Sequence, residues 1–198
     1  MILWDILIKE HESSIGLMSQ MQQYRFAACC ICESVLHLIG QQDDELIESI
    51  QANLQDSIIL SSLIADGVNL PSEVHVTEKS LTDLEDFIEI IETSSTQVPG
   101  LYDLSMALFT FIESIENHSI AKQTTEIASY SYQAILDEQL MFNLPKRSIT
   151  DSELVHLEEK NLICTQIIAA QIEWYRNIKD DKLIPIKFET LRRAISKN

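Results

Sequence analysis

Apolar residues recur at spacings of three and four along almost the whole chain, and no segment sustains the alternation of apolar and polar residues that marks a half-buried strand. Glycine and proline number only four each, well below their usual shares of roughly 7% and 5%, which disfavours a fold made of hairpins and tight turns. The sequence therefore predicts one all-α domain over residues 1–198. We expect a compact bundle of about seven or eight helices, mostly antiparallel to their neighbours.

The expected helices follow from this spacing together with cap and turn residues. They cover residues 2–21, 23–39, 43–65, 81–92, 101–117, 120–140 and 151–180, and a short basic helix follows in 186–197. The 151–180 helix would be the longest element, about 45 Å at ~1.5 Å per residue. Ser80 with Asp83, and Thr150 with Glu153, have the spacing of capping boxes. The basic segment 182–198 is amphipathic, and we expect it to pack on the acidic body; a membrane surface is the alternative.

Negative charge is concentrated in the first three quarters of the chain. Residues 1–145 carry 4 Lys or Arg against 23 Asp or Glu, a net of −19, while residues 146–198 carry 10 against 8, a net of +2. The density is highest from residue 43 to residue 92, where 13 acids face a single base, Lys79. This balance argues against nucleic-acid binding. It indicates either an ordinary solvated surface or a docking face for a basic partner.

Three cysteines, Cys29, Cys30 and Cys32, lie within four positions of the 23–39 helix. Successive helical residues point about 100° apart, so these side chains diverge and do not close around one ion. The only other thiol is Cys164. We therefore interpret the cluster as core packing, with redox sensing and adventitious metal binding as alternatives.

Two pairs of an acid and a histidine are candidate chemical sites. Glu33 and His37 lie at i and i+4 on a largely apolar face, where a buried pair would have shifted pKa values. The favoured interpretation is a structural ion pair or a partly exposed stripe. Glu153 and His156 match the Glu-x-x-His element of di-iron bundles, but that chemistry needs two such motifs. The sequence contains no phosphate loop, nucleophile elbow or zincin motif. We expect no enzymatic activity, metal or cofactor.

The amino-terminal residues have no basic leader, and Asp5 interrupts their apolar run, so a secretory signal is not expected. No window of roughly 18 uninterrupted apolar residues occurs, so no membrane span is expected. We therefore predict a cytoplasmic protein with reduced cysteines.

Three segments carry a family resemblance. The Cys32-Glu33 segment downstream of "QQYR", the central "GLYDLSMALFTFIESI" and the late "SELVHLEEKNLICTQIIAAQIEW" resemble the YjaG-like family of helical bacterial proteins. The resemblance implies a compact helical bundle and carries no assigned activity. Ser34 stands where the family has an arginine that could pair with the glutamate, and Gly40 and Gln41 replace a proline-containing segment.

The functional hypothesis rests on the acidic stretch. Small size, acidity and a lack of catalytic motifs are typical of immunity proteins. An immunity protein neutralises a basic bacterial toxin by covering its cationic surface. A housekeeping scaffold or adaptor, and a metal-binding or enzymatic bundle, are the alternatives. The sequence leaves monomer and homodimer open. The residues predicted to bind the partner are Asp43, Asp44, Glu45, Glu48, Asp83, Glu85, Asp86, Glu89 and Glu92.

Overall fold

The computed structural model describes residues 2–41, 44–68, 78–94, 98–140, 149–182 and 188–196, and all of their side chains except those of residues 9 and 78–80. These ranges contain eleven α-helices, two 3₁₀ turns and no strand, which confirms the predicted all-α class. The elements are α1 (Leu3–Ile8), η1 (Lys9–His11), α2 (Glu12–Gly16), α3 (Gln20–Gly40), α4 (Asp44–Asn53), α5 (Gln55–Ala65), α6 (Glu78–Thr93), α7 (Leu101–Glu116), η2 (Ile120–Lys122), α8 (Thr124–Leu140), α9 (Asp151–Lys160), α10 (Leu162–Lys179) and α11 (Glu189–Ile195).

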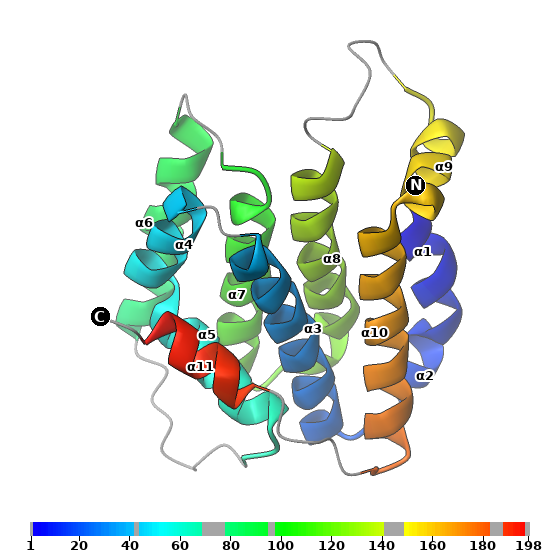
Figure 1. Ribbon diagram of the computed structural model, residues 1–198. Helices are drawn as coiled ribbons and strands as arrows, with labels where there is room; N and C mark the ends of the chain where they lie inside the picture. Colours follow the sequence, from blue (N-terminus) through cyan, green and yellow to red (C-terminus); the bar gives the residue numbers. More distant parts are fainter. Residues whose placement is uncertain are drawn as a thin grey trace.

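Helix α3 is the centre of the molecule. It packs against α5, α7, α8 and α10, and Figure 1 shows α10 running beside it on one side and α5 with α11 on the other. Every residue from 26 to 32 is buried, because neighbouring helices surround α3 on all sides. Two short hydrogen bonds of 2.6 Å attach it to its neighbours, from the Tyr24 hydroxyl to the Ser114 carbonyl on α7 and from the Ser34 hydroxyl to the Ser131 carbonyl on α8.

The expected amino-terminal helix over 2–21 is divided into α1, η1 and α2, and α3 begins after a break. Ser19 caps α3 in a capping box with Gln22. The buried amide of Gln23 donates to the carbonyl oxygens of Ile15 and Met18, both at 3.2 Å, and so satisfies backbone groups that the break leaves open. A polar side chain in the core therefore makes this break stable.

The expected long helix over 151–180 is also wrong. Asn161 has an extended backbone, and its side-chain oxygen accepts hydrogen bonds from the backbone N–H groups of Ile163 (2.9 Å) and Cys164 (3.1 Å). Asparagine is among the best amino-terminal cap residues, so α9 ends here and α10 begins. The expected 43–65 helix is similarly divided at Leu54. These breaks are why the described ranges hold more helices than predicted.

The predicted caps have different outcomes. The capping box of Thr150 and Glu153 at the start of α9 is confirmed. The predicted box of Ser80 and Asp83 is wrong, because α6 already begins at Glu78 and residue 80 lies inside the helix.

The basic helix α11 packs against α5 and α3. Arg192 donates to the carboxylate of Asp66 at 2.6 Å and to the hydroxyl of Ser62 at 3.1 Å, both on the carboxyl-terminal side of α5. The Asp66 side chain is only 6% exposed, so this ion pair is shielded from water and screened less than a surface pair.

Candidate functional site

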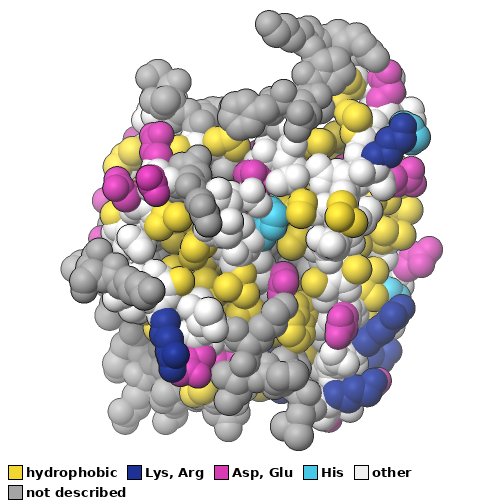
Figure 2. Space-filling model, viewed as in Figure 1, with side chains coloured by type: hydrophobic (Ala, Val, Ile, Leu, Met, Phe, Trp, Pro, Cys, Tyr) yellow, Lys and Arg dark blue, Asp and Glu magenta, His cyan; other side chains and the backbone are white. Residues whose placement is uncertain are grey.

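The predicted partner-binding residues that the structure describes are all exposed. Those on α4 are Asp44, Glu45 and Glu48, and those on α6 are Asp83, Glu85, Asp86, Glu89 and Glu92. Asp43 lies outside the described residues. Helices α4 and α6 contact each other, so the two acidic segments are neighbours in space. Figure 2 shows acidic side chains gathered over this side of the molecule, with further ones scattered over the rest of the same face.

The acidic residues of α6 divide between two flanks of the helix. Its buried stripe consists of Leu84, Phe87 and Ile91. At about 100° per residue, Asp83 and Asp86 fall on one side of this stripe, and the glutamates fall on the other side and toward the solvent. The predicted residues on α6 are therefore distributed over two faces of this helix.

The flank that carries Asp83 and Asp86 borders a groove between α6 and the α4–α5 junction. The groove has a volume of about 530 Å³. We call it the acidic groove, and its lining residues are Gln51, Ala52, Asn53, Gln55, Asp56, Ser57, Asp83, Leu84, Asp86, Phe87 and Ile90.

The acidic groove combines negative charge with exposed apolar surface. Asp56, at the start of α5, adds a third carboxylate to those of Asp83 and Asp86. Ile90 is 62% exposed and lies on the same flank of α6. An arginine or lysine of a partner can pack its aliphatic stem on Ile90 and place its charged end beside these carboxylates. Sequence reasoning missed Asp56 because it is isolated in the sequence and joins the groove only through the packing of α5 against its neighbours.

The other flank of α6 leads to a second hollow, of about 280 Å³, next to α7 and α8. There the hydroxyl of Tyr102 donates to Glu92 at 3.1 Å. On the adjoining helices, the nearly buried Asp103 hydrogen-bonds with Asp137, and burial, followed by this neighbouring carboxyl, raises the pKa of Asp103 to about 7. Asp103 therefore exchanges a proton near neutral pH.

The cysteines lie in the core, as predicted. Cys29, Cys30 and Cys32 are fully buried on α3, and Cys164 is fully buried on α10. Burial raises the pKa of the Cys30 and Cys32 thiols well above the usual value, and that of Cys164 to about 11. The reactive thiolate form of these three groups is therefore strongly disfavoured at neutral pH.

Glu33 and His37 line the same small hollow, of about 270 Å³, between α3 and α10. The ring nitrogen Nε2 of His37 lies 2.8 Å from the side-chain amide of Gln41 and 3.6 Å from the carboxylate of Glu138 on α8. The imidazole is therefore held by Gln41, which directly follows α3, and by Glu138 on α8, and these contacts account for its position.

Glu153 and His156 have separate partners. Glu153 accepts the backbone N–H of Thr150 at 2.9 Å as part of the capping box, and the exposed His156 lies 3.8 Å from Glu159. Across the residues with described side chains, no group of three His, Cys, Asp or Glu is placed to hold a metal ion.

The most unusual polar group is one that sequence reasoning missed. Glu158 on α9 is fully buried; its carboxylate accepts the backbone N–H of Leu3 at 2.9 Å and the hydroxyl of Tyr132 at 2.7 Å. Burial raises the pKa of Glu158, and these hydrogen bonds partly oppose that shift. Glu158 thus attaches α1 to α8 and α9, and full burial gives a substrate no access to it.

A second buried amide completes this attachment. Gln171 on α10 accepts the indole N–H of Trp4 at 2.7 Å and donates to the carbonyl of Ala128 on α8 at 3.2 Å. Helix α1 is therefore held against α8, α9 and α10 by polar contacts as well as by apolar packing.

Comparisons with known proteins give no relative. No family model, curated protein or solved structure matches this chain significantly. None of the helices in the described ranges combines the length and the apolar character needed to cross a bilayer.

Proposed function

We propose that this protein is a non-enzymatic inhibitor that binds a basic protein, and that it acts as an immunity protein by covering the cationic surface of a bacterial toxin. The observation that carries the proposal is the acidic groove, which Asp56, Asp83 and Asp86 line together with the exposed side chain of Ile90. Charge supplies attraction and orientation, and Ile90 supplies apolar surface that is buried on association.

The long-range field supports the same proposal. The formal net charge of −17 accelerates encounter with a basic protein by roughly 10- to 1,000-fold, an effect that falls steeply with added salt. If the target is a nuclease, the carboxylates would stand in for nucleic-acid phosphates. A gene that lies beside that of a secreted toxin would fit this proposal, whereas an isolated gene would fit an adaptor.

The test uses two charge reversals on the same helix. D83K/D86K alters the acidic groove, and E85K/E89K alters the other flank of α6. Both variants raise the formal net charge by four, from −17 to −13, and all of the substituted side chains are exposed. The full chain is immobilised to capture proteins from its native host, and a basic protein recovered at unit stoichiometry is purified for binding measurements.

We expect D83K/D86K to weaken this complex by about 100-fold or more, because close charge pairs at an interface are strongly coupled. E85K/E89K should retain most of the affinity and should still protect cells that express the partner. Equal effects of the two variants, or a complex insensitive to salt, would contradict the proposal and favour a scaffold whose acidity serves solubility.

A further inference from the structure

Helices α6, α7 and α8 meet at a junction that holds two carboxyl groups in contact. The junction consists of Asp103 and of five residues that line the hollow of about 280 Å³ next to α7 and α8, which are Ile91, Glu92, Gly100, Tyr102 and Asp137. Asp103 is 8% exposed and hydrogen-bonds with the exposed Asp137. Two ionised carboxylates have no proton to donate to each other. This hydrogen bond therefore requires that the pair hold one proton.

The close packing of α7 on α8 brings the two carboxyls together. Gly100 precedes the first turn of α7, and an added Cβ there would overlap the backbone carbonyl of Ala134 on α8. Asp103 and Asp137 each lie three residues beyond this contact along their own helix. The two helices are antiparallel neighbours (Figure 1), and helical side chains lean toward the amino terminus of their helix. The carboxyls therefore converge on the contact from opposite sides.

The same junction connects α7 to α6. The hydroxyl of Tyr102 on α7 donates to the carboxylate of Glu92 on α6 at 3.1 Å. Glu92 and Asp137 line the same hollow, so a negative charge on Asp137 faces a second carboxylate. Like charges in a partly buried site repel strongly because little water screens them. Ionisation of the pair therefore opposes the packing of all three helices.

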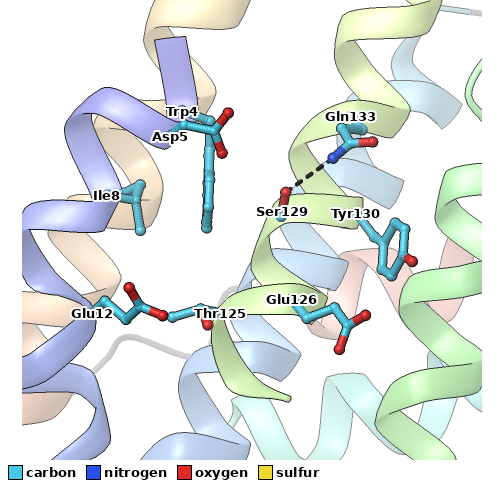
Figure 3. Close-up of a pocket in the computed structure, with 9 residues that line it drawn as sticks. All are labelled: Trp4, Asp5, Ile8, Glu12, Thr125, Glu126, Ser129, Tyr130 and Gln133. Atoms are coloured by element: carbon cyan, nitrogen blue, oxygen red, sulfur yellow. Dashed lines mark hydrogen bonds between the residues drawn. The ribbon is translucent and has the colours of Figure 1, made fainter. Parts of the chain in front are cut away.

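Further negative charge lies on the neighbouring part of α8. Figure 3 shows Glu126 and Tyr130 projecting from the flank of α8 that faces away from the amino-terminal helices. Burial raises the pKa of the Tyr130 phenol, and the charges of Glu126 and Asp103 raise it further. Helices α7 and α8 contain no lysine or arginine. No base within these helices therefore offsets a second charge on the pair.

The other elements that pack on α7 are α3, α5 and η2. Their charged residues and histidine lie over Gly67, in the other hollows or at the carboxyl-terminal end of α7, and they are Arg25, Glu33, His37, Asp56 and Lys122. The proton of Asp103 therefore depends on burial and on the contact with Asp137, which together raise the pKa of Asp103 to about 7.

Helix α6 is attached to the bundle less firmly than the central helices. Its buried side chains, where the structure describes them, are Leu84, Phe87 and Ile91, and the last two are 9% and 8% exposed. An element with few buried side chains opens locally at a small cost in free energy. The charge at the junction therefore affects how often the carboxyl-terminal half of α6 detaches.

We propose that this junction is a proton-dependent latch. While Asp103 and Asp137 share a proton, they hold the start of α7 against α8, and α6 stays docked. When the proton leaves to water through the exposed Asp137, the carboxylates repel each other and Glu92. The end of α6 and the start of α7 then open more often. The latch is independent of the proposed partner, although α6 also forms one wall of the acidic groove.

Amide hydrogen exchange measures such openings segment by segment. The full-length protein is measured at four pH values from 5 to 8, and each rate is divided by the intrinsic exchange rate at that pH. We expect the protection of amides in 88–93 and 101–106 to fall about fivefold or more over this range, and to stay below that of α10 amides. D103N has no carboxyl proton to lose and should hold this protection within about twofold.

Matched variants separate the latch from the overall charge. D83N removes the same charge from an exposed position on α6 and should keep the pH dependence of the wild type. D137N, also at an exposed position, should reduce the pH dependence by about half and gives a second test if D103N folds poorly.

Three results would overturn the latch. Junction amides that are as protected as those of α10, and change in parallel with them, would show that the proton acts only on global unfolding. A pH dependence that survives unchanged in D103N or D137N would assign it to other groups. Protection of 88–93 that does not vary with pH would show that α6 is not coupled to the pair.

Discussion

Replacing Asp103 by asparagine should change how stability depends on pH. Asp103 lies on α7, is 8% exposed and hydrogen-bonds with Asp137 of α8. Two carboxyls in contact favour a shared proton, because both cannot ionise without repulsion in a partly buried site. Burial and the neighbouring Asp137 raise the pKa of Asp103 to about 7.

The sign follows from proton linkage. An unfolded aspartate has a pKa of ~3.9, so between about pH 4 and pH 7 the folded chain holds a proton that the unfolded chain has released. The free energy of unfolding therefore falls as pH rises through this window, and the full penalty applies above pH 7. A difference of roughly three pH units corresponds to at most ~4 kcal/mol. Solvent around the exposed Asp137 reduces this to about 2 kcal/mol.

D103N has no proton to lose and can still donate a hydrogen bond to Asp137. We expect D103N to match the wild type near pH 4 and to be more stable by about 2 kcal/mol at pH 8. The measurement is urea unfolding of both proteins at four pH values from 4 to 8. The difference between their free energies of unfolding, plotted against pH, isolates the titration of Asp103 from that of other groups. D137N should reduce the pH dependence partially. A D103N protein that is destabilised equally at every pH would refute this reasoning.

Three further predictions concern the core. Gly100 has φ of +77°, and an added Cβ would overlap the backbone carbonyl of Ala134, so G100A should lower the free energy of unfolding by about 2 kcal/mol or more in urea denaturation; G16A, where a Cβ meets nothing within 4 Å, should not. E158A leaves the Leu3 amide and the Tyr132 hydroxyl unsatisfied and should cost about 3 kcal/mol, with faster hydrogen exchange across α1, whereas E158Q keeps an acceptor and should lose much less. The four buried thiols should resist a disulfide reagent in the folded protein and react fully in denaturant; rapid native reaction would contradict their burial.

The sequence predicted most of the helices because their apolar spacing and caps are local properties. Thr150 with Glu153 could be read as a capping box, since both partners lie within one helical turn. Asn161 is also a favourable cap residue, and its side chain acts within one helical turn. The apolar spacing continues on both sides of it, however, and this spacing predicts one uninterrupted helix. The amino-terminal break could not be read locally, because the buried amide of Gln23 stabilises it after the chain has folded back.

The candidate sites were less predictable than the helices. The acidic stretch was visible in the composition, but the sequence did not indicate that Asp83 and Asp86 share a groove with Asp56 while Glu92 pairs with Tyr102. Helix phase separates the two flanks of α6, and the packing of α5 decides which flank has a neighbour. The carboxyl pair between α7 and α8 depends on how closely these two helices approach each other, for which a single sequence gives no signal.

By itself the sequence determined the helical class, the excess of negative charge and the apolar cysteine-rich character of α3, because these depend on composition and on the spacing of neighbouring residues. The tertiary structure alone decided the environment of each charged group. Glu158 and Glu159 are adjacent and identical, yet α1 covers the first and leaves the second in water. Which carboxylate is buried depends on the element that packs over it, and that element comes from the opposite end of the chain.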